Sequence, residues 1–534
     1  MAIDCLPLKK TGYFSELICD YIDEKDELKP FYNRFPTIEN FEGQINEKAI
    51  HFPEAHRAVL YDALLKQYDA FNVSGSTKNN LIMLKEPTTF TVVTGHQLNL
   101  FTGPLYFLYK IISTINLTLQ LKKEYPKYNF VPIYWMATED HDFDEINYFN
   151  LKGKKLQWNR DASGAVGHLK TEGLQEVYDA FANEIGHSDT AEALKELFQK
   201  AYLNHNNLTD ATRYLANELF GHYGLVIVDG DDIDLKKLLI PYIKKDLFET
   251  IPYQKVSETN VRLQELSKDY EIQVNPREIN YFYLRDDIRE RIVESGDRYA
   301  LTDSKVSWSK SELLKEIDDF PGRFSPNVIA RPIYQEVILP NLCYIGGGGE
   351  LAYWLELKSS FEAIDVPFPM LLLRNSALVI SEKQRKKLIK MDLTIPDLFM
   401  KQSSFINKKI RAISNIDIDF SSQKKLLEEQ FKGLYDLAEQ TDKSFLGAVK
   451  AQEVKQKRGL DKLEKRLLKA QKRKLKDQVV RMTEIQNELF PSTSLQERNL
   501  NFSELYLDLG DKLIPLLMNS LRPLSKDFTI IHIA

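Results

Sequence analysis

The stretch TVVTGHQLNLFTGPLYFLYKIISTI, residues 91–115, decides the fold class. It begins with the β-branched run Thr91-Val92-Val93, which favours a buried strand, and continues into the polar segment Gly95-His96-Gln97. Apolar residues then recur at helical spacing from Leu105 onward. A strand, a polar loop and a helix in this order are typical of a βαβ unit, whose ligand site lies at the carboxyl end of the strand.

The same pattern returns along the chain and predicts an α/β protein with a parallel sheet. VPIYWMATEDHDFDEI (131–146) is an apolar strand that runs into charged residues, and GLVIVDGDD (224–232) is a second strand with an acidic end. ARPIYQEVILPNLCYIGGGGELAYWLELKSSFEAI (330–364) predicts a helix, a strand, a glycine loop and a helix. PFPMLLLRNSALVI (367–380) is expected to form one further buried strand.

The 534 residues exceed what one hydrophobic core usually fills, so more than one domain is expected. Residues 381–490 are charged and follow a long helical period, which predicts a coiled coil or a helical hairpin arm. Residues 528–533 are expected to form a last strand. We expect a core of residues 1–160, 301–380 and 499–534, an α+β insertion over 161–300 and a helical domain over 381–498.

Composition argues against several classes of protein. The net charge of −6 gives no general case for nucleic-acid binding, and three scattered cysteines do not suit a disulfide framework. The N-terminal residues lack the apolar region of a signal peptide, and no run approaches the ~20 apolar residues of a membrane span. We therefore expect a soluble cytoplasmic protein that binds neither nucleic acid nor membrane.

The polar segment of the first stretch is the first candidate site. Gly95 permits close approach of a ligand, His96 suits acid–base chemistry, and the helix start near Gly103 suits an anion. Gln97 and Asn99 lie in the same segment. The alternative is a loop in which His96 only fixes a turn.

The second candidate site is the acidic segment Glu139-Asp140-His141-Asp142. Its oxygens could bind a divalent cation or hold a substrate ammonium. A metal is the weaker interpretation, because no second histidine lies at ligand spacing. The alternative is that these carboxylates only cap the next helix.

The third candidate site is the loop Gly346-Gly347-Gly348-Gly349, with Glu350 and Tyr353 in the helix that follows. Four glycines in a row suggest a backbone that a ligand approaches closely, although a flexible linker is the alternative. Upstream, Arg331 and Gln335 could bind a carboxylate or phosphate. Cys343 is expected to be an inert core thiol, and the lysine-rich residues 450–476 to be either the solvated face of the arm or a polyanion site.

Taken together, TGHQLNLFTGPLYFLYKIIS, VPIYWMATEDHDFDEIN and ARPIYQEVILPNLCYIGGGGELAYWLELK resemble the cysteine-adding enzyme family of bacillithiol biosynthesis. The resemblance implies a Rossmann-like core, a connecting-peptide domain and a coiled coil that supports a homodimer. It also implies a ligase that joins the carboxyl of cysteine to the amine of glucosaminyl-malate. Because a carboxylate and an amine do not condense in water, ATP or another nucleotide, with Mg, is the candidate activator.

On this basis each candidate residue has an expected role, with no residue assigned as a metal ligand. The expected catalytic residues are His96, Gln97, Asp140 and Asp142. The expected substrate-binding residues are Gly95, Asn99, Gly103, Glu139, His141, Arg331, Gln335, Gly346, Gly347, Gly348, Gly349, Glu350 and Tyr353. Two other functions stay open: a metal-assisted hydrolase that uses the acidic segment, and a dimeric coiled-coil scaffold without catalysis.

Overall fold

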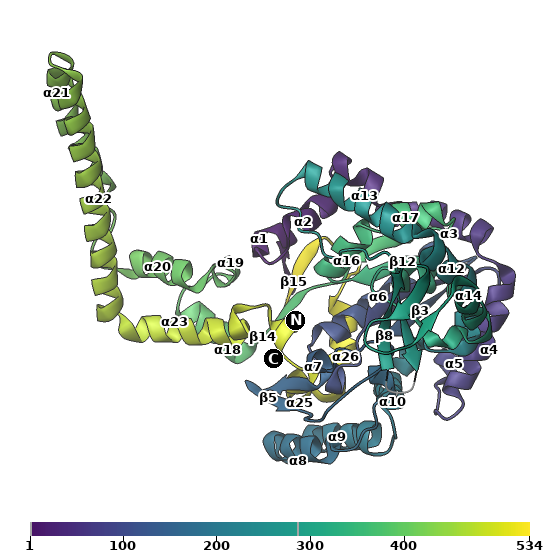
Figure 1. Cartoon of the computed structure of the whole chain (residues 1–534). Helices are drawn as coiled ribbons and strands as arrows, with labels where there is room; N and C mark the ends of the chain where they lie inside the picture. Colours follow the sequence, from purple (N-terminus) through teal and green to yellow (C-terminus); the bar gives the residue numbers. More distant parts are fainter. Residues whose placement is uncertain (1–2, 286–287, 534) are drawn as a thin grey trace.

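A computed structural model describes residues 3–285 and 288–533 of the chain. Its centre is a five-stranded sheet in the order β13-β12-β2-β3-β6, and every neighbouring pair is parallel (Figure 1). The strands are β2 (Thr89–His96), β3 (Asn129–Met136), β6 (Val226–Asp229), β12 (Asn341–Gly346) and β13 (Met370–Leu373). Chain order runs outward from β2 on one side through β3 and β6, and on the other through β12 and β13. This is the doubly wound order of Rossmann-like folds, and the order reverses between β2 and β12. The predicted α/β class is confirmed.

The first stretch of the sequence folds as expected. All eight residues of β2 are buried, and α6 (Tyr106–Glu124) covers β2 and β3, the two strands that it connects. Between β2 and α6 lies a short helical turn, Leu100–Thr102, in which Phe101 has a φ of 48°. The polar loop is therefore tightly folded rather than extended.

A second, antiparallel sheet in the order β10-β9-β8-β7-β11 lies in the later part of the predicted insertion and beyond it. It includes β9 (Arg298–Leu301), β10 (Ser307–Trp308) and β11 (Phe324–Pro326). Its first strands, β7 (Tyr281–Arg285) and β8 (Ile288–Ser295), follow the helices α12 (Ile240–Glu249) and α13 (Ile251–Leu266). The strand β6 also falls within residues 161–300, yet it pairs with β3 in the central sheet. The proposed division of residues 1–380 into core and insertion stays a prediction.

The two chain ends meet in a third sheet. β15 (Asp527–Ile533) pairs antiparallel with β1 (Ile3–Pro7) and parallel with β14 (Ala377–Ser381). The last strand was expected and is confirmed, although it joins this small sheet and not the central one. The expected single strand over 367–380 is wrong. The chain breaks at Arg374-Asn375-Ser376, so that β13 belongs to the central sheet and β14 to the third.

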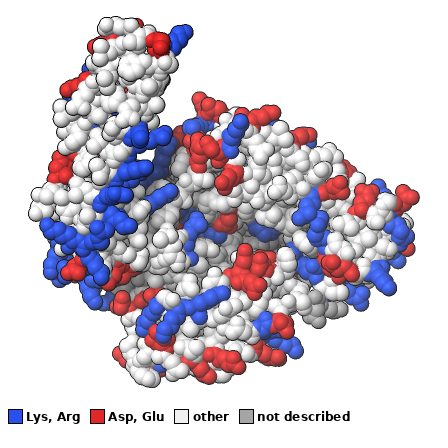
Figure 2. All heavy atoms as spheres, turned by 60° about the vertical axis from the view of Figure 1, so that its left-hand side comes forward, with Lys and Arg blue, Asp and Glu red and all other residues white. Residues whose placement is uncertain are grey.

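The helical arm extends away from the core (Figure 1). It consists of a hairpin of α21 (Ser421–Glu439) and α22 (Lys443–Lys474), carried by α20 (Gln402–Ile413) and α23 (Lys476–Leu489). Lysine and arginine side chains gather where the arm approaches the core (Figure 2). Of the described helices, none is both long and apolar enough to cross a membrane.

Candidate active site

A pocket of about 820 Å³ opens at the carboxyl ends of β2, β3 and β12, where the strand order reverses. Open α/β sheets place their ligands at this position. The ends of β2 and β3, the helices α6, α15 (Ala330–Ile338) and α16 (Gly348–Leu355), and residues 498–499 all line the pocket. Segments of all three candidate sites, far apart in the sequence, therefore meet here.

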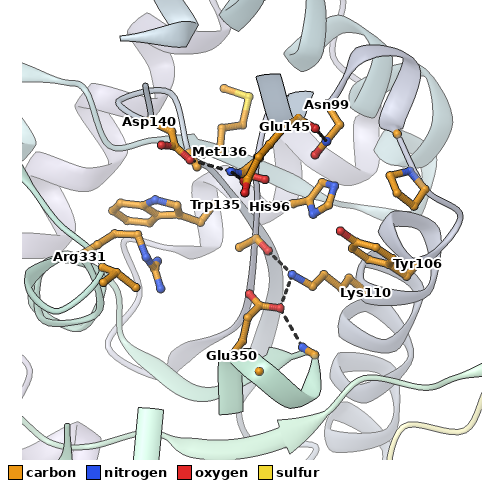
Figure 3. A pocket seen from close by; sticks show the side chains of 18 of the residues that line it. His96, Asn99, Tyr106, Lys110, Trp135, Met136, Asp140, Glu145, Arg331 and Glu350 are labelled. Carbon is orange, nitrogen blue, oxygen red and sulfur yellow. Dashed lines mark hydrogen bonds and ion pairs between the residues drawn. The ribbon is translucent and has the colours of Figure 1, made fainter. Parts of the chain in front are cut away.

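One wall of the pocket is acidic (Figure 3). The amide of Gln97 donates to Asp140 Oδ2 and to Glu145 Oε2, at 2.8 Å in each case. Burial raises the pKa of Asp140, but hydrogen bonds from His141 and Gln97 outweigh it and hold that pKa well below the usual range. Asp140 is thus ionised at neutral pH, and together with Glu145 it offers negative charge to a cationic group.

The opposite wall is built around Glu350 (Figure 3). Its carboxylate accepts hydrogen bonds from the backbone N–H of Gly347 at 2.8 Å and from the Tyr344 hydroxyl at 2.7 Å. Lys110, which is almost fully buried on α6, forms an ion pair with Glu350 at 2.5 Å and donates to the carbonyl of Gly95 at 2.7 Å. Burial lowers the pKa of Lys110, and the pair with Glu350 partly offsets that effect. This ion pair ties α6, β2 and α16 together.

The glycine loop has two different reasons for its glycines. A Cβ on Gly346 would lie 2.9 Å from Leu351 Cδ1, so packing requires glycine there. A Cβ on Gly347 would meet only ordinary contacts, 3.5 Å from Glu350 and 3.8 Å from Arg374, and its φ is −74°. Neither the backbone conformation nor the packing requires glycine at position 347. A ligand that fills this part of the pocket would require it, because a Cβ would take up the same space. The first-turn N–H groups of α16 have no partner within the helix, and Gly347, Gly348 and Gly349 all line the pocket.

Arg331 of α15 brings positive charge to the pocket. Its guanidinium donates to Gln335 Oε1 at 3.1 Å and to the Tyr353 hydroxyl at 3.4 Å, and it lies over the ring of Trp135. Both hydrogen-bond partners are neutral, and within the described part of the chain no carboxylate lies at ion-pair distance. Its charge is therefore available to an anionic ligand.

His96 lines the pocket but carries no charge at neutral pH. Its ring packs against Tyr106 and Phe107, with ring centroids 5.4 and 5.0 Å away. Burial, reinforced by the nearby charges of Lys110 and Arg374, holds the pKa of His96 well below its usual value. The predicted acid–base role would have to start from a neutral imidazole.

Some expected site residues lie outside the pocket lining. Asp142 caps the short helix α7 (Phe143–Ile146) by accepting from the N–H of Glu145. His141 is exposed and contacts Arg289, and Gln335 is buried beneath Arg331. Gly346 is the last residue of β12.

Three of the remaining expected residues, Glu139, Asn99 and Gly103, line the pocket but already contact other groups. The amide of Asn99 donates to the carbonyl of Glu145 at 3.1 Å. Glu139 forms an ion pair with the buried Lys236 at 2.6 Å. Gly103 has a φ of +61° and packs so closely on Asn99 that a Cβ would lie 2.6 Å from it. The expected anion site at the helix start near Gly103 stays a prediction. The helix begins at Tyr106, and the Leu105 N–H before it already donates to the carbonyl of Leu500 at 2.7 Å.

Comparison with known proteins assigns this architecture to a family. The model of the N-terminal Rossmann-like domain of bacillithiol biosynthesis BshC matches residues 1–375. The model of the C-terminal coiled-coil domain of BshC matches residues 377–533. The chain belongs to the BshC family.

Relatives in the BshC family match over the full length. A protein of Flavobacterium johnsoniae is 58% identical over 533 residues and covers 100% of both chains. A protein of Christiangramia forsetii is 59% identical over 99% of each chain, and one of Bacillus cereus is 27% identical over 93% of this chain and 95% of its own. All three carry the name "Putative cysteine ligase BshC". The expected resemblance, the Rossmann-like core and the coiled-coil domain are confirmed.

Sequence reasoning missed several pocket residues of this BshC-family chain. They are Tyr106, Lys110, Trp135, Arg289, Arg374 and Arg498. A lysine inside the apolar run FLYKIIS and an arginine directly after LLL were signals that could have pointed to two of them. Arg498 follows the arm in the sequence, and nothing local connects it to the sheet.

Proposed function

We propose that this protein is a ligase that joins the carboxyl group of cysteine to the amine of glucosaminyl-malate and so completes bacillithiol. The observation that supports it best is one pocket with the carboxylates of Asp140 and Glu145 on one wall and an unpaired guanidinium with a glycine-lined helix start on another. The full-length relatives are named as cysteine ligases, which supports the cysteine half of this reaction. The cavity is also large enough to hold more than one small substrate.

In this proposal the acidic wall holds the ammonium group of cysteine. Asp140 stays ionised because its oxygens accept hydrogen bonds from Gln97 and from the backbone N–H groups of His141 and Asp142. Gln97 holds Asp140 and Glu145 side by side, which presents two acceptors to one cation. Gln97 therefore positions the carboxylates, and Asp140 touches the substrate.

The wall formed by α16 and Arg331 suits the phosphate groups of an activating nucleotide. A nucleotide such as ATP, when bound, would supply activation of the carboxylate. The first-turn N–H groups of α16 and the guanidinium of Arg331 fit its phosphate groups, because both offer donors to an anion. Within the described residues no group of three or more His, Cys, Asp or Glu suits a metal ion. In this proposal, Mg would bind to the phosphate oxygens of the nucleotide.

The rival hydrolase receives less support from this geometry. It would use the acidic segment as a metal site, but Glu139 pairs with Lys236 and Asp142 caps α7. Of the expected acidic residues 139–142, Asp140 lines the pocket without a lysine or arginine ion-pair partner among the described residues and without capping a helix, and its neighbour His141 lies 3.5 Å away.

We also propose that the arm joins two copies of the chain. The hairpin buries a small cluster of Phe431, Ala438 and Val449. Large apolar side chains along it stay exposed: Leu426, Leu434, Leu437, Phe445, Leu446, Val454 and Leu463. A second copy of the hairpin would cover them, as in a helical bundle.

The purified protein should be incubated with cysteine and glucosaminyl-malate, with and without ATP and magnesium, and the thiol product followed by mass spectrometry. Product that forms only with ATP would support the ligase and an activated carboxylate. Absence of product under both conditions would contradict the proposal.

A further inference from the structure

Five cationic side chains line the pocket, and most of their charge is already balanced. Lys110 pairs with Glu350, and Arg374 pairs with Glu497 at 2.7 Å. Arg289 lies close to the charges of Glu139 and Asp140. Arg331 has only neutral hydrogen-bond partners. Arg498 is exposed, and its guanidinium has neither a hydrogen-bond partner nor an ion-pair partner among the residues that the structure describes.

Hydrogen bonds to the core hold the segment that carries Arg498, although none of them involves the Arg498 side chain. This wall segment, residues 496–501, follows the arm and returns to the core. The carboxylate of Glu497 accepts from Ser376 Oγ at 3.0 Å and from the Ala377 N–H at 2.9 Å, and it is fully buried. Gln496 exchanges two hydrogen bonds with the backbone of Val379.

The far end of the wall segment is attached to the polar loop after β2. The amide of Asn501 donates to the carbonyls of Phe101 and Gly103 at 2.8 and 2.6 Å. The backbone around Arg498 is thus held from both sides, and the guanidinium alone is left to move. A fixed backbone with a free charged group is suited to ligand binding, because little of the chain has to be ordered when the ligand arrives.

Arg498 and Arg331 serve different parts of the pocket. Arg374 lies over the ring of Tyr106 at 5.0 Å. Arg374 also pairs with Glu497, the residue before Arg498, and both Tyr106 and Arg498 line the pocket, so Arg498 lies on the same side as Tyr106. Burial raises the pKa of the Tyr106 hydroxyl, and the charges of Arg374 and Arg498 oppose that rise. Tyr106 and Arg331 lie on opposite sides of the pocket (Figure 3). The pocket therefore has two separate unpaired cations, one beside α16 and one beside the wall segment.

We infer that Arg498 binds the carboxylate groups of the sugar-malate substrate, so that its dicarboxylate end lies against the wall segment. This inference rests on the proposed ligase function, in which the pocket has to bind two separate anionic groups: the phosphates of the nucleotide and the carboxylates of the malate. The phosphate side fits Arg331 and the first turn of α16, and Arg331 contacts that helix through Tyr353. The guanidinium that remains is Arg498, and a guanidinium recognises carboxylates through paired hydrogen bonds.

Calorimetric binding of L-malate and of glucosaminyl-malate to the full chain tests the inference. Arg498→Gln removes the charge from an exposed side chain, so folding should be unaffected. We expect both affinities to fall about tenfold or more and the affinity of the wild-type protein to decrease with added salt. Arg498→Lys should keep part of the affinity.

Arg481→Gln serves as the matched control, because Arg481 is an exposed arginine of α23 that lies outside the pocket lining. It should bind as the wild type does. Affinities that are unchanged in Arg498→Gln, or a wild-type protein that binds neither compound, would overturn the inference. So would loss of malate binding in Arg331→Gln but not in Arg498→Gln. Because binding is measured without turnover, a failed ligase assay would not by itself decide this result.

Discussion

At the scale of single residues, the ion pair between the buried Lys110 and the half-buried Glu350 links the sheet to the glycine loop. Lys110→Met removes the cation and leaves Glu350 with less compensation, so we expect the free energy of unfolding to fall by roughly 2–4 kcal/mol. The double variant Lys110→Met/Glu350→Gln should recover part of that loss. Urea unfolding of the two variants measures both effects, and a single variant as stable as the wild type would contradict them.

A second residue, Asp246 on α12, makes stability depend on pH. It is fully buried, and although it accepts two hydrogen bonds from Asn280, burial raises its pKa from 3.8 to about 7. Between pH 3.8 and about 7, the Asp246 carboxyl is ionised in the unfolded chain but protonated in the folded chain. The stability that Asp246 contributes is therefore complete below about pH 4 and is lost as the pH rises through about 7.

Asp246→Asn removes this titration. Between pH 5 and pH 8, the unfolding free energy of the wild type should fall by about 3 kcal/mol relative to that of Asp246→Asn. Urea unfolding of both proteins at four pH values in this range measures it. A difference that stays constant with pH would show that Asp246 does not titrate there.

At the scale of elements, the glycine loop contains one glycine that packing requires, Gly346, and one that packing does not require, Gly347. Gly347→Ala has an ordinary φ and open contacts, so we expect a loss of at most about 1 kcal/mol in stability but a large loss of activity. Gly346→Ala should instead destabilise the fold, because its Cβ would press on Leu351, Glu350 and Tyr344. Melting temperature and product formation, measured on both variants, distinguish the two positions. A fully active Gly347→Ala variant would remove the reason for placing a ligand there.

The elements also show what the sequence could reveal. β2, β3 and β12 could be predicted because each is an apolar run that ends in polar residues, and parallel strands bring those ends to one edge. The break at Arg374-Asn375-Ser376 could not, because it depends on Glu497, which lies more than a hundred residues away and binds Arg374 and Ser376. The place of Arg498 in the pocket could not be predicted either, because Arg498 also lies more than a hundred residues from the strands of the pocket in the sequence. The role of Glu139 was also hidden, because its partner Lys236 lies on another element.

At the scale of the whole molecule, the arm leaves apolar side chains exposed far from the core. If a second copy covers them, Leu437→Lys/Leu446→Lys should yield a protein with the mass of one chain, since each lysine would bury a charge in the interface. Gln440→Lys/Gln452→Lys adds the same charge at exposed polar positions of the arm and should leave the dimer intact. Light scattering coupled to gel filtration gives both masses. A wild-type protein that already has the mass of one chain would contradict the proposed dimer.

The central claim is that cysteine is joined to its partner in the pocket where the strand order reverses. The most direct test is the rate of thiol formation by Gln97→Ala, Asp140→Ala and Arg331→Ala, each compared with the wild type under saturating cysteine, glucosaminyl-malate and ATP. We expect each rate to fall about a hundredfold or more, while circular dichroism shows that all three variants remain folded. Wild-type rates in all three would contradict the account and place the chemistry elsewhere in the molecule.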